Sequence, residues 1–111
     1  MAAPDIEASG LKFYPAPGSP LTLSNAFTGY SVPYTVVGKA PGGKLRVREC
    51  QLVFDGPRYF DSTPDRILPG RPGIEQEIDL VWKPKRKCWA ETGKYGMRAW
   101  FGKTVFSPYV D

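Results

Sequence analysis

The chain has 111 residues, 41% of them hydrophobic, which suits one domain with a single core. Its twelve glycines and twelve prolines exceed what a helical bundle tolerates, because glycine carries an entropic cost in a helix and proline lacks the backbone donor. The net charge of +4 comes from 15 basic and 11 acidic residues spread along the chain, and it fits plain solubility as well as attraction to an acidic partner. The composition favours an all-β domain and argues against a helical one.

Residues 1–20 are expected to form an extended N-terminal arm with a proline-rich crossover, ahead of a β-domain at residues 21–111. Pro15, Pro17 and Pro20 disfavour helix and stiffen the exit from the arm. This separation predicts that the first fourteen residues bind outside their own domain.

The next segments read as strands divided by turns. Residues 21–37 have the β-branched and aromatic content of a strand pair, and residues 39–44 form a turn rich in glycine and proline. Residues 45–54 form a strand in which the apolar parity changes partway, which predicts a β-bulge near Arg48 and Glu49. Residues 58–73 are expected to be irregular.

The clearest strand is predicted at residues 74–82, where apolar residues alternate with Glu75, Glu77 and Asp79. Strands at residues 94–101 and 104–110 follow, joined by a short turn at Gly102 and Lys103. The parity of the two clearest strands places six residues at the centre of the core: Ile78, Leu80, Trp82, Tyr95, Met97 and Ala99.

About seven short strands with regularly spaced turns favour a β-sandwich or a small barrel. Residues 68–70, 74–82 and 92–100 resemble the E strand, loop and F strand of immunoglobulin-like and fibronectin-like domains. The resemblance implies a single antiparallel immunoglobulin-like β-sandwich, with Tyr95 in the tyrosine corner. The same stretch is similar to the C-terminal half of the bacterial intracellular proteinase inhibitor family, which shares that fold.

Catalysis is not expected. The chain has no histidine, which removes the commonest general base and most zinc sites, and its two cysteines are too few for a four-thiolate metal site. Glu75, Glu77 and Asp79 lie on what is predicted to be a solvated strand face without a pocket. The sequence therefore predicts no enzyme, no metal site and no cofactor.

The sequence shows no signal-peptide pattern and no apolar run long enough to span a membrane. We therefore expect synthesis in a cytoplasm, and the finished protein could then belong to a virion. Cys50 and Cys88 are expected to be reduced and buried in that compartment, or to be a candidate disulfide if a leader has been removed.

The sharpest candidate site is a basic turn bracketed by tryptophans. It predicts partner contacts by five residues: Lys83, Lys85, Arg86, Lys87 and Trp89. Tryptophan and arginine anchor protein interfaces, whereas cations with aromatics also bind phosphates and bases, and many charge runs are simply solvated turns. A protein partner is ranked above a nucleic acid. Arg58 and Tyr59 form a second candidate contact within the irregular stretch.

Three functional classes follow. The first is a structural or accessory subunit of a large assembly, such as a phage or viral decoration or minor structural protein, bound to neighbours that include identical copies. The second, implied by the resemblance, is an intracellular proteinase inhibitor or other protein-binding module, with residues 61–71 as the inhibitory loop. The third is a carbohydrate- or nucleic-acid-binding module that uses Trp89, Trp100 and the basic turn.

Overall fold

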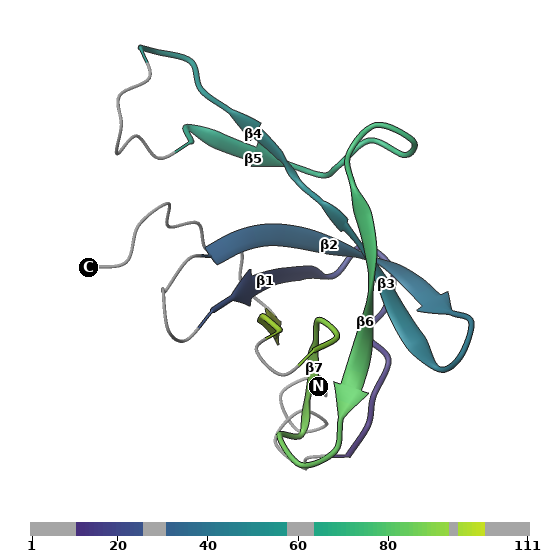
Figure 1. Ribbon diagram of the computed structural model, residues 1–111. Helices are drawn as coiled ribbons and strands as arrows, with labels where there is room; N and C mark the ends of the chain where they lie inside the picture. The colour runs from purple at the N-terminus through teal and green to yellow at the C-terminus, as the bar shows by residue number, and fades with distance from the viewer. Residues whose placement is uncertain (1–10, 26–30, 58–63, 94–95, 102–111) are drawn as a thin grey trace.

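A computed structural model describes residues 11–25, 31–57, 64–93 and 96–101, and within these ranges the fold is all-β (Figure 1). Eight antiparallel strands make a closed barrel and a separate two-stranded ribbon. The strands are β1 (Pro20–Ser24), β2 (Ser31–Ala40), β3 (Lys44–Glu49), β4 (Gln51–Val53), β5 (Arg66–Leu68), β6 (Glu77–Lys83), β7 (Cys88–Ala90) and β8 (Arg98–Phe101).

The barrel runs in the order β1-β2-β3-β6-β7-β8, so each strand pairs with the next barrel strand along the chain. The first and last strands close it: Leu21 lies opposite Phe101, and Ser24 lies opposite Arg98. Closure removes the open edges that a sheet would otherwise expose.

This closure overturns the immunoglobulin-like sandwich that the sequence resemblance implied. A sandwich has two packed sheets, whereas here a single six-stranded sheet closes on itself through β1 and β8. The resemblance was misleading because alternating residues and regular turns mark strands in both architectures without saying which strands pair. The expected tyrosine corner at Tyr95 lies outside the described residues.

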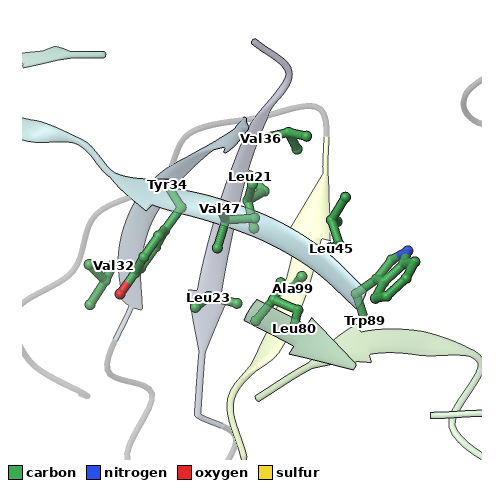
Figure 2. Close-up of a cluster of buried hydrophobic side chains, with 10 residues drawn as sticks. All are labelled: Leu21, Leu23, Val32, Tyr34, Val36, Leu45, Val47, Leu80, Trp89 and Ala99. Carbon is green, nitrogen blue, oxygen red and sulfur yellow. The ribbon is translucent and has the colours of Figure 1, made fainter. Parts of the chain in front are cut away.

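The core fills the inside of the barrel (Figure 2). Leu21 and Leu23 are two residues apart on β1, so they share a face of the strand, and both are fully buried. Leu45 and Val47 stand in the same relation on β3 and are also fully buried. The buried cluster comprises Leu21, Leu23, Val32, Tyr34, Val36, Leu45, Val47, Leu80, Trp89 and Ala99. Each barrel strand contributes at least one of these side chains.

The predicted core is confirmed in part. Leu80 and Ala99 are buried in the cluster, while Ile78, Trp82 and Met97 pack against it with partial exposure. Tyr95 and the strand predicted at residues 104–110 lie outside the described residues.

The strand boundaries differ from the prediction in several places, and the strand predicted at residues 94–101 is found in the described residues only from Arg98. The strand expected from residue 74 begins at Glu77, because Ile74 lies in a turn whose amide donates to the Arg71 carbonyl at 3.1 Å. The three-residue strands β5 and β7 were not predicted.

The change of parity predicted near Arg48 and Glu49 falls one residue later, at Cys50. There the chain passes from β3 to β4, and the Cys50 amide donates to the Pro33 carbonyl at 3.1 Å. Cys50 is buried like Val47, so the break turns Cys50 inward, whereas Leu52 and Phe54 beyond it are only partly buried. Beyond it, β4 leaves the barrel and pairs with β5 (Figure 1).

The N-terminal segment packs on its own barrel from Phe13 onward. The Phe13 ring meets Trp82 and Phe101 edge-on, with ring centroids 5.8 and 5.5 Å apart. Tyr14 packs on Trp89 and donates its hydroxyl hydrogen to the Gly43 carbonyl at 3.1 Å. The expected outward-binding arm is therefore wrong for Phe13 and Tyr14, because the end of the barrel offers them aromatic surface. Residues 1–10 lie outside the described part.

Candidate functional site

The basic turn connects β6 to β7 and is exposed from Pro84 to Lys87. The Lys87 amide donates to the Lys83 carbonyl at 2.7 Å, which closes the turn. Lys87 has a left-handed φ of 55°, an uncommon conformation for a residue other than glycine. The turn therefore has a defined backbone that directs Lys85 and Arg86 into solvent.

The two tryptophans that bracket the turn lie beneath it. Trp82 and Trp89 are cross-strand neighbours, with ring centroids 5.5 Å apart in an edge-to-face arrangement. Trp89 is fully buried, and its indole N–H donates to the Phe13 carbonyl at 2.8 Å. The structure thus places Trp89 in the core rather than on the partner-binding surface predicted for it. The four cations remain on the surface, and their partner role stays a prediction.

The second predicted contact, Arg58 with Tyr59, lies outside the described residues. The proposed inhibitory loop at residues 61–71 is described from residue 64, and strand β5 occupies three of its residues. The inhibitory role of this stretch stays a prediction.

Trp100, the other tryptophan predicted to bind a ligand, is 47% exposed on β8. Its indole N–H donates to the Ser24 hydroxyl at 2.8 Å, and the Arg98 guanidinium stacks 4.0 Å from the ring centroid. With Trp89 in the core, the two tryptophans do not share one surface, so the expected pair of exposed aromatics is not formed.

The ribbon of β4 and β5 is a candidate that the sequence did not reveal. Its register places Leu52 opposite Ile67. At its far end, the Asp55 amide donates to an Asp65 carboxylate oxygen at 2.7 Å, and Arg66 pairs with Asp55 at 3.3 Å. Leu68 is 37% exposed on this ribbon.

A close backbone contact fixes the base of the ribbon to the barrel. Gly70 is buried, and a side chain there would overlap the Glu49 carbonyl oxygen and lie 2.9 Å from Cγ of Arg48. The Gln51 amide group also donates to the Pro69 carbonyl at 2.8 Å. Only glycine permits this approach, so Gly70 positions the ribbon relative to β3.

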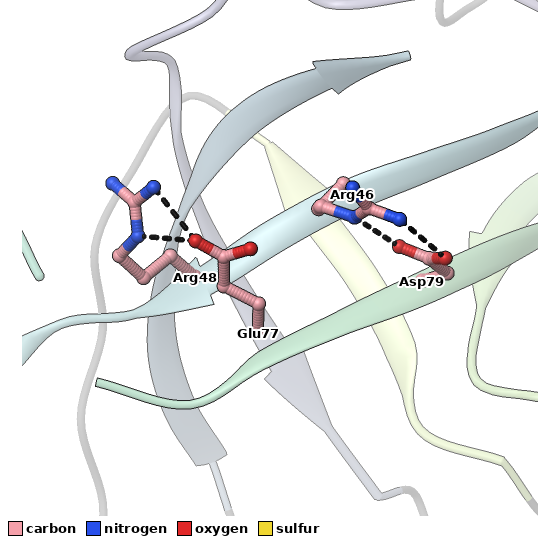
Figure 3. A network of polar contacts seen from close by, with 4 residues as sticks. All are labelled: Arg46, Arg48, Glu77 and Asp79. Carbon is pink, nitrogen blue, oxygen red and sulfur yellow. Dashed lines mark hydrogen bonds and ion pairs between the residues drawn. The ribbon is translucent and has the colours of Figure 1, made fainter. Parts of the chain in front are cut away.

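The acidic face of β6 is not a free row of carboxylates. Asp79 pairs with Arg46 at 2.8 Å, and Glu77 pairs with Arg48 at 2.7 Å, both across the β3–β6 ladder (Figure 3). The hydrogen bond from Arg46 lowers the pKa of Asp79, and the same bond raises the pKa of Arg46. Both pairs join the two strands side by side, and the Arg46–Asp79 pair favours the ionised form of each of its partners.

The third acidic residue, Glu75, accepts two hydrogen bonds from the Arg71 side chain and one from the Arg71 amide at 2.6 Å. These bonds, the side-chain contact foremost, lower the pKa of Glu75 to about 2. Glu75 therefore closes the turn before β6 and does not join the other two carboxylates.

Cys50 and Cys88 are free and buried, and burial raises the pKa of the Cys50 thiol. Within residues 11–25, 31–57, 64–93 and 96–101, no three acidic or cysteine side chains gather closely enough to hold a metal ion. The same ranges contain no helix that is long and apolar enough to cross a membrane.

Comparison with known proteins finds no matching family model, curated protein or solved structure.

Sequence reasoning missed two groups of residues. Arg46 and Arg48 alternate with Leu45 and Val47, and this outward parity is the signal that could have paired them with the acidic face of β6. The ribbon had no such signal, because β5 is three residues long and shows little alternation.

Proposed function

We propose that the protein is a non-enzymatic subunit of a larger assembly, such as a decoration or minor structural protein of a phage or viral particle. It acts through protein–protein contacts, and the observation that carries the proposal is the projecting β4–β5 ribbon (Figure 1).

The ribbon forms a sheet separate from the barrel. A two-stranded ribbon is marginally stable in water unless it packs against other structure. In the described residues β4 and β5 pair only with each other, while every barrel strand has two neighbours. The outer edges of the ribbon therefore present backbone donors and acceptors to which a strand of a neighbouring subunit can add.

Apolar side chains accompany these open edges. Leu68 on β5 is 37% exposed, and Ile74, in the turn between β5 and β6, is 66% exposed. The other exposed large apolar residues of the described part are Leu11 and Trp100. A neighbour that paired with β5 would cover Leu68 and gain both hydrogen bonds and apolar contact.

The experiment compares two leucine substitutions in the full chain. Leu68→Glu places a charge on the ribbon, whereas Leu11→Glu places the same charge on a residue that is 70% exposed at the N-terminal segment. Each tagged variant is purified gently from its native host, and the mass of the particle that carries it is measured by sedimentation and mass photometry.

We expect to recover the unmodified chain and the Leu11→Glu variant in a particle of defined stoichiometry that is far heavier than the 12.3 kDa chain. Leu68→Glu should be recovered outside that particle while remaining folded. Recovery of the unmodified chain as a free monomer would refute the assembly role. Normal incorporation of Leu68→Glu would refute the role of the ribbon.

A further inference from the structure

One end of the barrel gathers cations from three separate parts of the chain. Because β3 and β6 are antiparallel, with Leu45 opposite Leu80, the β2–β3 turn and the β6–β7 turn lie at the same end. The N-terminal segment joins them there through the bond from Tyr14 to Gly43. We call this surface the cationic end, and it consists of Lys12, Lys39, Lys44, Lys83, Lys85, Arg86 and Lys87.

None of these cations forms an ion pair in the described part of the chain, although Asp79 attracts Lys44 and the Lys83 ammonium donates to the Gly93 carbonyl at 3.1 Å. The four ion pairs found there use Arg46, Arg48, Arg66 and Arg71. The charges of those arginines are therefore locally compensated, whereas the cationic end has only the attraction between Asp79 and Lys44 to offset its charge. Uncompensated charges of one sign raise the local potential and attract a partner of the opposite sign.

Two of the lysines are held together on a single aromatic ring. The Lys39 ammonium lies 4.7 Å from the centroid of Tyr14, and the Lys12 ammonium lies 5.4 Å from the same centroid. A side chain at Gly43 would come within 3.1 Å of the Lys12 Nζ, so the glycine leaves room for this ammonium. Cation–π attraction offsets the repulsion between the two like charges.

The composition of this surface distinguishes between partner classes. Protein interfaces are depleted in lysine and enriched in exposed aromatics, but six of the seven cations here are lysines and Trp89 is in the core. The aromatic anchor that had favoured a protein partner is therefore absent from the surface.

The same burial argues against single-stranded nucleic acid, which binds by stacking its bases on exposed aromatic rings. Trp82 and Tyr14 are partly buried, and their rings pack against other side chains of the barrel end. What remains is a set of six ammonium groups and one guanidinium group without an exposed stacking platform. Such a surface matches the regular phosphates of a duplex, which are contacted without reading the bases.

We propose that the cationic end binds the phosphate backbone of double-stranded nucleic acid without sequence preference. The proposal is independent of the assembly role, because the ribbon extends from the opposite end of β3.

The test measures binding of a short mixed-sequence DNA duplex by fluorescence anisotropy, from about 50 to about 200 mM salt. The variant is Lys12→Gln with Lys39→Gln, two residues far from the basic turn in sequence. The matched control is Arg66→Gln with Arg71→Gln, which removes the same charge from ion-paired residues away from the cationic end. Circular dichroism and urea unfolding confirm that each variant is folded.

The proposal predicts that affinity of the unmodified chain falls steeply with salt. The Lys12 and Lys39 variant should lower the slope of log affinity against log salt by about 2, since each phosphate contact contributes about 0.9. The arginine control should leave the slope unchanged. If the lysine variant loses its fold, Lys85→Gln with Arg86→Gln replaces it, because both side chains lie in the exposed turn.

Three results would overturn the proposal. The first is no duplex binding at the lowest salt. The second is an equal loss in the arginine control, which would show an effect of net charge alone. The third is tighter binding to polyglutamate or to a single strand than to the duplex, which would assign the surface to an acidic protein or to unpaired bases.

Discussion

Replacing Phe13 by alanine tests whether the N-terminal segment is an integral part of the barrel. The Phe13 ring packs edge-on against Trp82 and Phe101, while its carbonyl accepts the indole hydrogen of the buried Trp89. The substitution removes the ring and leaves the backbone bond in place. Its effect therefore reports the side-chain packing alone.

The expected cost follows from burial and ring geometry. Fully burying a phenylalanine contributes about 1.5 to 3 kcal/mol, and the partly buried Phe13 should contribute about half of that. Each edge-to-face pair adds about 0.5 to 1.5 kcal/mol, and Phe13 makes two. The free energy of unfolding should thus fall by roughly 2 to 4 kcal/mol.

The assay is urea unfolding followed by tryptophan fluorescence. Leu11→Ala is the matched control, because Leu11 lies in the same segment but is 70% exposed, and it should change stability by less than about 0.5 kcal/mol. If Phe13→Ala lowers the free energy of unfolding no more than the control does, the packing argument is refuted. The N-terminal segment would then be an arm that does not depend on the barrel.

Three further predictions test the barrel and the base of the ribbon. Leu80→Ala should cost about 2 to 5 kcal/mol in urea unfolding, because Leu80 is fully buried, and a cost below about 0.5 kcal/mol would contradict the register of β6. Gly70→Ala should destabilise the chain by about 1 to 3 kcal/mol, because the added methyl group would overlap the Glu49 carbonyl oxygen. Gly56→Ala is the control and should be neutral, because the space around Gly56 is open. Equal effects of the two substitutions would show that the base of the ribbon is not closely packed. The pKa of Glu75 is lowered from 4.5 to about 2 in the folded chain, so the ionised carboxylate stabilises the fold. This stabilisation is fully present above about pH 4.5 and is lost as the pH falls toward 2. The urea midpoint of the unmodified chain should therefore fall between pH 4.5 and pH 2, and it should fall less in Arg71→Gln. An unchanged pH profile in the variant would mean that the Arg71–Glu75 pair does not form in solution.

Periodicity in the sequence was enough to place the strands that have a buried face. The alternation in residues 74–82 correctly put Leu80 inside, and the change of parity near Glu49 marked the point where the chain leaves the barrel to within one residue. Both inferences depend only on whether a side chain faces water.

Pairing between distant strands could not be inferred in this way. Closure of the barrel depends on β1 meeting β8, about 76 residues later in the chain, and the alternation of Leu21 and Leu23 is the same in a sandwich. The resemblance to immunoglobulin-like domains filled that gap with the wrong architecture.

The site was anticipated only in its charges. Lys85, Arg86 and Lys87 lie on the exposed turn as expected and Lys83 is half-buried at the end of β6, but the nearby Trp89 faces the core. Lys12 and Lys39 could not be assigned to the same surface, because only the fold brings Tyr14 and the β2–β3 turn together.

Hydrogen exchange of the β4 and β5 amides is the most direct test of the assembly role. In the free chain these amides should exchange readily, because a two-stranded ribbon is weakly protected. In the native particle, pairing with a neighbouring subunit should slow them by at least about tenfold, while the amides of β1 and β2 change little. Unchanged exchange in the ribbon of particle-bound chains would contradict the account.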